Sequence, residues 1–412
     1  MSYWIINSLL DIDFYKFTMG QFILLNHSGT PVRFALKNRT TSIRLPESID
    51  MIELTCQLDH VRKLRFTNTE LHYLRGTNEY QDRMFCEKYL EFLKNLRLPP
   101  YRIDIDEKGQ FILEFPGMWE EVTYWEIYAL SIINELYFRS LMKGLSVFAK
   151  DCIRAKGVKR LETKIRELRK YPALKFTDFG TRRRFGREWQ EYVVKSISEE
   201  LPGQFIGTSN TKLAETLSLT PMGTSAHELP MVLSGIMYDS DESIRASHHR
   251  ALIEWWDLYG QGLSIALPDT FGTDFFFETF SKEQAEKWKG LRQDSGDPFA
   301  FGYKTISFYD KMGIDSLKKM IVFSDGLEMD KMIRLFLKFN KVINVSFGWG
   351  TNLTNDLGFP ALSLVVKPIE ACGHPLVKLT DNIQKAMGNP EDIEKFRKIF
   401  SYRNDFTKTC VY

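Results

Sequence analysis

Short apolar runs alternate with helical segments along the middle of the chain, from about residue 121 to residue 357. Small polar residues follow each apolar run directly. Strands that alternate with helices are expected to pair in parallel. The runs that we expect to be strands are 174–177, 204–206, 221–222, 263–267, 288–291, 320–323 and 342–347.

The polar residues after these runs predict where a functional site lies. The carboxyl ends of parallel strands share one edge of a sheet, so side chains that follow successive strands should meet there. An open doubly wound sheet usually concentrates its chemistry at one or two strand ends. About seven ends carry reactive residues in this chain. This number favours a closed α/β barrel over the open sheet.

The first part of the chain has a different pattern. Residues 13–26 carry an apolar face typical of a helix, residues 32–36 predict a strand, and two or three helices follow between residues 46 and 96. Alternating apolar residues at 101–106 and 111–115 flank a glycine-containing turn, which predicts a β-hairpin.

The last part of the chain returns to alternating runs. Residues 361–370 and 375–379 predict antiparallel strands, and residues 390–400 predict a helix. These strands have no obvious place in a barrel, so we expect them to join the first part. The predicted domains are an N-terminal α+β domain at 1–120, a catalytic α/β domain at 121–357, and a C-terminal segment at 358–412 that packs on the N-terminal domain.

Composition narrows the class of protein. The 412 residues are 43% hydrophobic and 26% charged, which is typical of a globular protein of more than one domain. The net charge of +2 is too small for nucleic-acid binding through overall charge, so any anion site must be local. There is no run of about 20 apolar residues and no secretory signal pattern, so we expect no membrane partner and a cytoplasmic location.

The cysteines and most histidines point away from metal or disulfide chemistry. Five cysteines without a CxxC pair predict free, buried thiols in a reducing compartment. His248 and His249 lie on a charged helical run and are expected to face solvent. The absence of HExxH and CxxC patterns argues against a transition metal held by protein ligands alone.

The segment 221–230 holds the richest mixture of reactive groups. It combines a glycine, two hydroxyls, an imidazole and a carboxylate. His227 can act as an acid, a base or a nucleophile. Alternatively, the segment is a turn leading into a helix, with Thr224 or Ser225 as the cap and Glu228 in the first turn. The other strand ends bear on this choice.

Several of these ends could bind phosphate. Three consecutive arginines, 182–184, follow Asp-Phe-Gly, and Arg292 precedes an Asp-Ser-Gly-Asp sequence. Residues 348–352, Gly-Trp-Gly-Thr-Asn, offer backbone N–H groups beside a hydroxyl. The arginine run could instead be a solvated helix face. The Gly-x-Gly pair is not a dinucleotide fingerprint, because Leu353 stands at the third glycine position.

Aspartates also recur at the predicted strand ends. Carboxylates next to phosphate-binding arginines can bind a ribose diol, hold Mg²⁺ or stabilise positive charge on a sugar. Turn and helix-cap chemistry also favours aspartate, so each one alone is weak evidence. The aspartates in question are Asp178, Asp269, Asp294, Asp297 and Asp325.

Taken in order along the chain, these motifs resemble the nicotinate phosphoribosyltransferase family, in its shorter bacterial and fungal form. The resemblance covers most of the chain. The matching segments are 9–19 (LLDIDFYKFTM), 179–183 (FGTRR), 207–210 (GTSN), 223–228 (GTSAHE), 269–274 (DTFGTD), 292–298 (RQDSGDP) and 347–353 (FGWGTNL).

The resemblance implies an irregular seven-stranded α/β barrel of the type II phosphoribosyltransferase kind, joined to an α+β domain. It implies the conversion of nicotinate and 5-phosphoribosyl 1-pyrophosphate to nicotinate mononucleotide and pyrophosphate, the first step of NAD salvage from nicotinate. This step would be coupled to ATP hydrolysis through a transiently phosphorylated histidine, with Mg²⁺ as cofactor. The protein would be a homodimer with active sites completed across the interface.

By matching motif, His227 is implied to be the phosphorylated histidine. Tyr15 of the neighbouring subunit and Phe179 would enclose the pyridine ring. The implied catalytic residues are His227, Asp294, Arg292 and Glu228, and Asp294 and Asp325 are the implied Mg²⁺ ligands. The implied substrate-binding residues are Tyr15, Phe179, Arg182, Thr224, Arg292, Ser295, Asp325, Gly326, Gly348, Gly350 and Thr351.

Two other functions remain open at this point. A nicotinamide or quinolinate phosphoribosyltransferase of the same fold would need different charges around the ring, namely a carboxylate acceptor or additional cations. A sensor that binds the nucleotide without turnover belongs to a different class. The presence of His227, Arg292, Asp294 and Asp325 together argues against the sensor, because a binder has no need of a phosphorylatable histidine.

Overall fold

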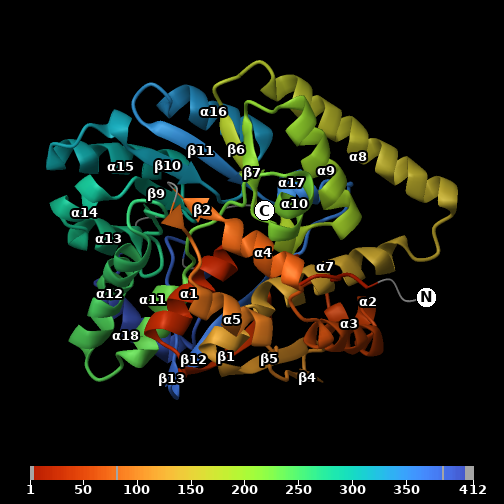
Figure 1. The fold of residues 1–412 in the computed structure, drawn as a ribbon, viewed down its shortest axis with the longest axis horizontal. Helices are drawn as coiled ribbons and strands as arrows, with labels where there is room; N and C mark the ends of the chain where they lie inside the picture. Colours follow the sequence, from red (N-terminus) through yellow and green to blue (C-terminus); the bar gives the residue numbers. More distant parts are fainter. Residues whose placement is uncertain (1–3, 80–81, 383–384, 404–412) are drawn as a thin grey trace.

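Two large β-sheets, a small two-stranded one and the helices around them make up the described part of the chain (Figure 1). The structure is a computed structural model and describes residues 4–79, 82–382 and 385–403. A six-stranded parallel sheet occupies one end and a five-stranded antiparallel sheet the other, and a third, two-stranded ribbon pairs β2 (Asn78–Glu79) with β3 (Asp82–Arg83).

The five-stranded sheet joins the two ends of the chain. Its strand order is β13-β12-β1-β5-β4. The predicted hairpin is confirmed, because β4 and β5 pair antiparallel. β1 pairs antiparallel with both β5 and β12, so a C-terminal strand lies beside an N-terminal one. The strands are β1 (Pro31–Asn38), β4 (Arg102–Ile105), β5 (Phe111–Met118), β12 (Leu364–Ala371) and β13 (His374–Pro375).

The second sheet is parallel throughout, as the alternation of strands and helices predicts. Its order is β7-β6-β11-β10-β9-β8. The strands are β6 (Lys175–Asp178), β7 (Phe205–Thr208), β8 (Ile265–Ala266), β9 (Gly290–Gln293), β10 (Met320–Phe323) and β11 (Asn344–Trp349).

The closed seven-stranded barrel is not confirmed. The expected strand at 221–222 makes only one parallel bridge, between Thr208 and Pro221, supported by a hydrogen bond from the Met222 N–H to the Thr208 carbonyl (2.9 Å). Proline lacks the N–H that a strand interior needs. The boundaries proposed at residues 120 and 357 stay a prediction.

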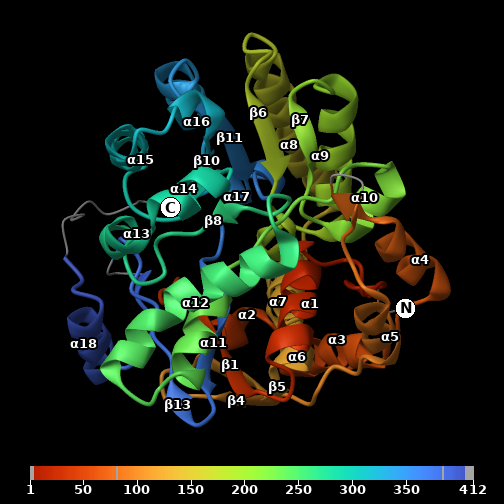
Figure 2. The same ribbon diagram turned by 60° about the vertical axis from the view of Figure 1, so that its left-hand side comes forward.

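Helices cover both sheets (Figures 1 and 2). The helices before the parallel sheet are α1 (Tyr15–Asn26), α2 (Leu45–Ser48), α3 (Met51–Lys63), α4 (Asn68–Gly76), α5 (Glu87–Asn95), α6 (Trp119–Val122), α7 (Trp125–Met142) and α8 (Val147–Leu168). Those that follow are α9 (Arg187–Glu200), α10 (Thr211–Leu217), α11 (Glu228–Ile236), α12 (Asp241–Tyr259), α13 (Thr273–Thr279), α14 (Lys282–Lys287), α15 (Pro298–Met312), α16 (Met329–Phe339), α17 (Thr351–Thr354) and α18 (Pro390–Ile399), with short 3₁₀ turns η1 (Thr181–Arg183) and η2 (Ser316–Lys318).

Two of these helices matter most for the site. The first fourteen residues of α7 are all buried, so this helix is a core element that contacts both η1 and β12. α11 is likewise apolar and almost wholly buried, and it packs against β12 and α12. Both helices therefore hold their first turns at fixed positions inside the molecule.

The burial of His248 and of three cysteines differs from what the sequence predicts. His248 is buried rather than solvated, because it shares a face of α12 with Ile244 and Trp255, and its ring packs 5.7 Å from that of Phe276. The four described thiols are free, but three of them are exposed rather than buried: Cys56, Cys86 and Cys372. Cys410 lies outside the described residues.

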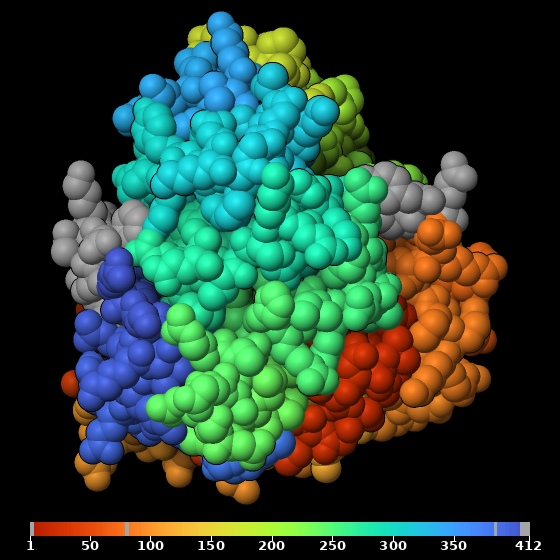
Figure 3. All heavy atoms as spheres, turned by 90° about the vertical axis from the view of Figure 1, so that its left-hand side faces the viewer, coloured from red at the N-terminus to blue at the C-terminus, as the bar shows by residue number. Residues whose placement is uncertain are grey.

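The C-terminal helix α18 lies beside α12, with the N-terminal helices on the other side of α12 (Figure 3). Within the part of the chain that the structure describes, no helix combines the length and apolar character needed to cross a bilayer.

Candidate active site

A cavity of about 580 Å³ opens where the carboxyl ends of the parallel strands face α7 and β12. It collects residues from both ends of the chain as well as from the strand ends. Eight cationic side chains and six carboxylates line it. They are Arg39, Arg182, Arg183, Arg292, Lys331, Lys367, Lys378 and Lys385 against Asp13, Glu126, Asp294, Asp325, Glu328 and Asp356.

His227 lies in this cavity with both ring nitrogens engaged. It immediately precedes α11, and its side chain is 3% exposed. Nδ1 lies 2.9 Å from the Thr270 hydroxyl, and Nε2 lies 2.9 Å from Oδ2 of Asp294. A carboxylate only accepts hydrogen bonds, so Nε2 carries the proton and Thr270 donates to Nδ1. The tautomer is thereby fixed, with the Nδ1 lone pair directed at a hydroxyl.

The imidazole is neutral near pH 7. Burial and, to a lesser extent, the nearby Lys378 lower the pKa of His227 to about 4, against the opposing effect of Asp269 and Asp294. For Asp294, burial favours the neutral acid, but the hydrogen bond from His227 and the charge of Arg292 outweigh it and hold its pKa well below the usual range. The pair is therefore a neutral imidazole bonded to a carboxylate.

The three consecutive arginines have different surroundings. Arg182 and Arg183 line the cavity, whereas Arg184 is fully buried and pairs with Asp11. Burial, together with the charges of Arg182 and Arg39, lowers the pKa of Arg183 to about 10. Two guanidinium groups thus face the cavity, which the alternative of a solvated helix face does not explain.

Two glycines of the predicted motifs allow close packing beside the cavity. A Cβ atom at Gly348 would lie 2.3 Å from the ring of Phe179, and one at Gly223 would lie 2.7 Å from the backbone nitrogen of Tyr15. Gly348 therefore lets the Phe179 ring approach the backbone of β11 closely. Gly223 brings the start of α1 against the segment that contains His227.

Tyr15 lines the cavity of its own chain, together with Phe179. Its hydroxyl donates to Oε2 of Glu126 (3.2 Å), and Arg182 approaches the same hydroxyl at 3.4 Å. The expectation that Tyr15 comes from a neighbouring subunit is therefore not needed to bring the two aromatic residues into one cavity.

Glu126 organises the side of the cavity that holds Tyr15. Its carboxylate is 1% exposed and lies 2.8 Å from Lys16, 2.6 Å from Lys367 and 3.4 Å from Arg182. Burial favours protonation, but these three cations reverse the effect and lower the pKa of Glu126. Four separate elements, α1, α7, η1 and β12, meet at this one carboxylate.

The remaining predicted residues divide into two groups. Thr224, Arg292, Asp325, Gly326, Gly350 and Thr351 line the cavity. Glu228 and Ser295 do not. Glu228 is fully buried and accepts hydrogen bonds from Lys16, Trp119 and Thr123, not from His227, so a role in orienting His227 gains no support.

Two of the aspartates at strand ends have structural roles, as their turn and cap alternatives predict. Asp178 accepts from the Gly180 N–H (2.7 Å) and from Thr208 and Gln190. Asp297 caps α15 by accepting from the Ala300 N–H (2.8 Å). Ser295 donates to Oδ2 of Asp269 (2.6 Å) beneath the cavity.

The sequence reasoning missed the cations that come from outside the parallel sheet. Arg39 follows β1, Lys367 lies on β12, and Lys378 and Lys385 follow β13. Lys385 holds both carboxylate oxygens of Asp325 at 2.9 Å. No local motif marks these residues. The only available signal is the expected packing of the C-terminal strands on the N-terminal part.

The ligand set that could hold a divalent cation differs slightly from the predicted one. Ligand atoms of His227, Asp269 and Asp294 lie within 4.8 Å of one another. Oδ1 of Asp269 is buried and has no hydrogen-bond partner among the described residues, which suits a cation ligand. Asp325, the second predicted ligand, is instead neutralised by Lys385. The donor set therefore fits Mg²⁺ at Asp294, with Asp269 as the closer second carboxylate.

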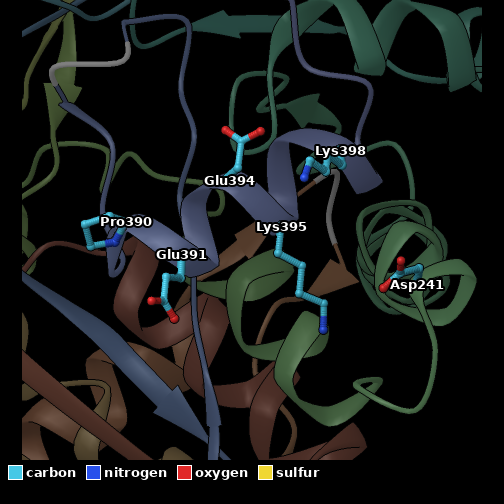
Figure 4. A pocket seen from close by; sticks show the side chains of 6 residues that line it. All are labelled: Asp241, Pro390, Glu391, Glu394, Lys395 and Lys398. Carbon is cyan, nitrogen blue, oxygen red and sulfur yellow. The ribbon is translucent and has the colours of Figure 1, made fainter.

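A second hollow has a similar volume but a different set of lining residues. It has a volume of about 520 Å³ and is lined by Asp241 and five residues of α18 (Figure 4). It lacks histidine, arginine and aromatic side chains. The combination of arginine, histidine and carboxylates at the carboxyl ends of parallel strands is found in the first cavity, and it defines an enzyme site for a phosphorylated substrate.

Comparison with known proteins identifies the family. The model of the nicotinate phosphoribosyltransferase N-terminal domain matches residues 10–134, and the model of the nicotinate phosphoribosyltransferase family matches residues 174–404. The chain belongs to the nicotinate phosphoribosyltransferase family and is an enzyme of that class, as the motifs indicate.

Solved structures agree over the whole length. The nicotinate phosphoribosyltransferase of Porphyromonas gingivalis is 29% identical, with a TM-score of 0.86 over 97% of this chain and 100% of its own. That of Vibrio cholerae is 30% identical, with a TM-score of 0.85 over 98% of this chain and 96% of its own.

Proposed function

We propose that this enzyme transfers the phosphoribosyl group of 5-phosphoribosyl 1-pyrophosphate to nicotinate and couples the transfer to ATP hydrolysis through phosphorylation of His227. The observation that carries the coupling is the state of His227: a neutral imidazole with a fixed tautomer, inside a cavity with more cations than carboxylates. The product would be nicotinate mononucleotide, which serves NAD synthesis.

The transfer needs charge placement more than proton transfer. The pyridine nitrogen attacks C1 of the ribose with its own lone pair, and the C1–O bond to pyrophosphate breaks with its electrons on the leaving oxygen. Arg182, Arg183 and Arg292 supply the positive charge that pyrophosphate requires. Tyr15 and Phe179 offer aromatic faces for the pyridine ring.

The phosphate end of the ribose has its own candidate subsite. Gly348, Gly350 and Thr351 line the cavity at the end of β11, where α17 begins. Backbone N–H groups and a hydroxyl in such a turn suit a phosphate. This placement leaves the other end of the substrate near His227 and Asp294.

The tautomer of His227 supports phosphorylation at Nδ1, because that nitrogen carries the free lone pair. Nδ1 would attack the γ-phosphorus of ATP, and the bond from phosphorus to the bridging oxygen would break with its electrons on ADP. Nε2 keeps its proton, which Asp294 accepts in a hydrogen bond. Water later takes the phosphoryl group and restores the imidazole. His227 precedes α11, whose N-terminal N–H groups favour the added negative charge.

Mg²⁺ would neutralise the polyphosphates, with Asp294 and either Asp269 or Asp325 as its ligands. Within the chain, Asp294 has two tasks, because it also accepts the hydrogen bond from His227. Its second oxygen accepts from Ser324 at 3.0 Å, which fixes the carboxylate.

Mass spectrometry after incubation with ATP and Mg²⁺ tests the coupling. We expect phosphate on His227, none in His227→Ala, and unchanged modification in His249→Ala, whose side chain is exposed on α12. Phosphate on another residue, with His227 unmodified, would refute the coupling. Turnover with nicotinate, nicotinamide and quinolinate then decides the substrate, and we expect nicotinate alone to react at a useful rate.

We also propose that the enzyme is a homodimer and that it is located in the cytoplasm. Sedimentation equilibrium of the purified chain should give twice the monomer mass of 48.1 kDa. A monomer with full activity would show that one chain forms a complete site, in agreement with Tyr15 lining its own cavity.

A further inference from the structure

A C-terminal strap, residues 376–382, crosses the ends of two parallel strands beside His227. The Leu379 N–H donates to the carbonyl of Thr270 (2.9 Å), and the Asp381 N–H donates to the Ser295 hydroxyl (3.0 Å). Thr270 is also the residue whose hydroxyl bonds to Nδ1 of His227. The strap is therefore anchored to the same residues that hold the imidazole.

Lys378 extends from this strap into the cavity. Its side chain is 7% exposed. It lines the cavity together with His227 and Asp294. The next residue, Leu379, is bonded to Thr270, which holds Nδ1 of His227. It is thus a cation next to the proposed phosphate acceptor, contributed by a part of the chain remote from the strand-end motifs.

Lys378 differs from the other buried lysines in its contacts. Lys16, Lys319, Lys367 and Lys385 each donate to a carboxylate or to backbone carbonyls. Among the described residues, the ammonium of Lys378 has neither a hydrogen bond nor an ion pair within 4.0 Å. The residue is largely buried but lines the cavity, so solvent in the cavity supplies the hydrogen bonds of this ammonium, and a bound anion would replace that solvent.

The neighbouring carboxylates do not take the place of that anion. Oδ2 of Asp294 bonds to His227 and its Oδ1 bonds to Ser324, while Oδ2 of Asp269 accepts from Ser295. Oδ1 of Asp269 has no hydrogen-bond partner among the described residues, but it lies on the side of His227, 3.7 Å from Nε2, and forms no ion pair with Lys378 within 4.0 Å. Three ammonium hydrogens of Lys378 consequently remain available to a ligand in the cavity. The oxygens of a phosphoryl group match this donor set in charge and in number.

We propose that Lys378 is a further catalytic residue, which binds the phosphoryl group while it passes from ATP to His227. This assignment rests on the proposed function. As Nδ1 forms its bond to phosphorus and the bond to the ADP oxygen breaks, the ammonium contacts the non-bridging oxygens of the transferred group. After transfer it neutralises part of the charge on the phosphorylated imidazole.

A lysine suits this task better than an arginine. The transferred group changes position during the reaction, and a compact ammonium with rotatable donors can follow it, whereas a guanidinium favours one planar arrangement. Arg182, Arg183 and Arg292 remain available for the pyrophosphate.

The test compares Lys378→Met, which keeps the length of the side chain, with Lys378→Arg and with the control Lys398→Met on the exposed side of α18. Quenched incubation of the full chain with γ-³²P-labelled ATP and Mg²⁺ gives the initial rate of His227 phosphorylation. We expect this rate to fall about 100-fold in Lys378→Met, as for loss of one charge-stabilising donor. Lys378→Arg should recover part of it, and Lys398→Met should equal the wild type.

Nicotinate binding to each variant, measured by calorimetry, shows whether a lower phosphorylation rate comes from the chemical step or from a misfolded protein. An unchanged dissociation constant in Lys378→Met shows that the cavity is intact. If phosphorylation of Lys378→Met stays within twofold of the wild type, or if nicotinate binding is lost in parallel, the assignment of Lys378 is wrong. If the wild type itself carries no phosphate on His227, the proposed coupling fails, and the role of Lys378 fails with it.

Discussion

Asp11 and Arg184 form a buried bidentate ion pair, with Oδ1 to Nη1 at 2.7 Å and Oδ2 to Nη2 at 2.8 Å. Asn210 donates to the same carboxylate at 2.7 Å. Through this pair the segment before α1 is held against the turn that follows β6. Because Arg184 is engaged there, only Arg182 and Arg183 of these three consecutive arginines line the cavity.

Replacing Asp11 by alanine should strongly destabilise the fold. The change leaves Arg184 buried without its carboxylate, and such a loss typically lowers the free energy of unfolding by about 3–5 kcal/mol. Urea denaturation measures the effect. The exposed pair of Arg169 and Glu200 provides the control, because Glu200→Ala should change stability by less than about 1 kcal/mol. Equal effects of the two substitutions would contradict the prediction.

Stability should depend on the ionisation of His248. Burial lowers the pKa of this imidazole to about 4, whereas in the unfolded chain it stays near 6.5. Between these values the unfolded chain binds a proton that the folded one does not, so stability falls as pH falls from 6.5 toward 4.

His248→Gln removes this part of the pH dependence. The loss of stability between pH 7.5 and pH 5 should be smaller in the variant than in the wild type by about 2 kcal/mol. His227 contributes with the same sign, so some dependence remains in the variant. Unfolding by urea at the two pH values gives the comparison, and an identical pH dependence in both proteins would contradict the assignment.

Gly348→Ala should weaken nicotinate binding. The added methyl group would lie 2.3 Å from the ring of Phe179, so the ring must move. Loss of one aromatic contact corresponds to a rise in the nicotinate KM of up to about tenfold. Gly203→Ala is the matched control, since nothing lies within 4 Å of its added methyl group, and it should leave the KM unchanged.

Glu126→Gln should impair turnover by releasing three cations from one anchor. Without the charge, Lys16, Lys367 and Arg182 lose their common partner and shift around the aromatic pair. Misplacement of positioning groups by about 1 Å can reduce kcat/KM by about 100-fold. Steady-state kinetics measures this, with the exposed Glu162→Gln on α8 as control. A variant of Glu126 with normal kcat/KM would show that the cations hold their places without it.

The sequence predicted best those elements whose pattern lies in residues close to one another along the chain. The β4–β5 hairpin, the parallel strands and the helix beginning near Pro390 all follow from alternation, periodicity or capping residues close in sequence. The expected strand at 221–222 is reduced to a single bridge, because pairing there depends on Pro221 and on tertiary geometry rather than on its own apolar pattern.

The candidate site was predictable only in part, for a similar reason. Motifs at strand ends point to His227, Asp294 and Arg292, because those residues stand next to the apolar runs that carry them. Glu126 and Lys378 reach the cavity through long-range packing, which single-sequence patterns do not reveal. The prediction that His248 faces solvent was wrong, because a helix with many charged residues can still bury one narrow face.

The pairing of β1 with β12, which sets Val32 beside Ala371, has a consequence for synthesis on the ribosome. β1 emerges early, yet one of its edges stays uncovered until β12 has also been made. Lys367 and Lys378 arrive in the same late stretch as β12. Until almost the whole protein has been translated, a nascent chain therefore exposes a strand edge with unpaired backbone groups, which favours aggregation. It also lacks part of its substrate cavity until then.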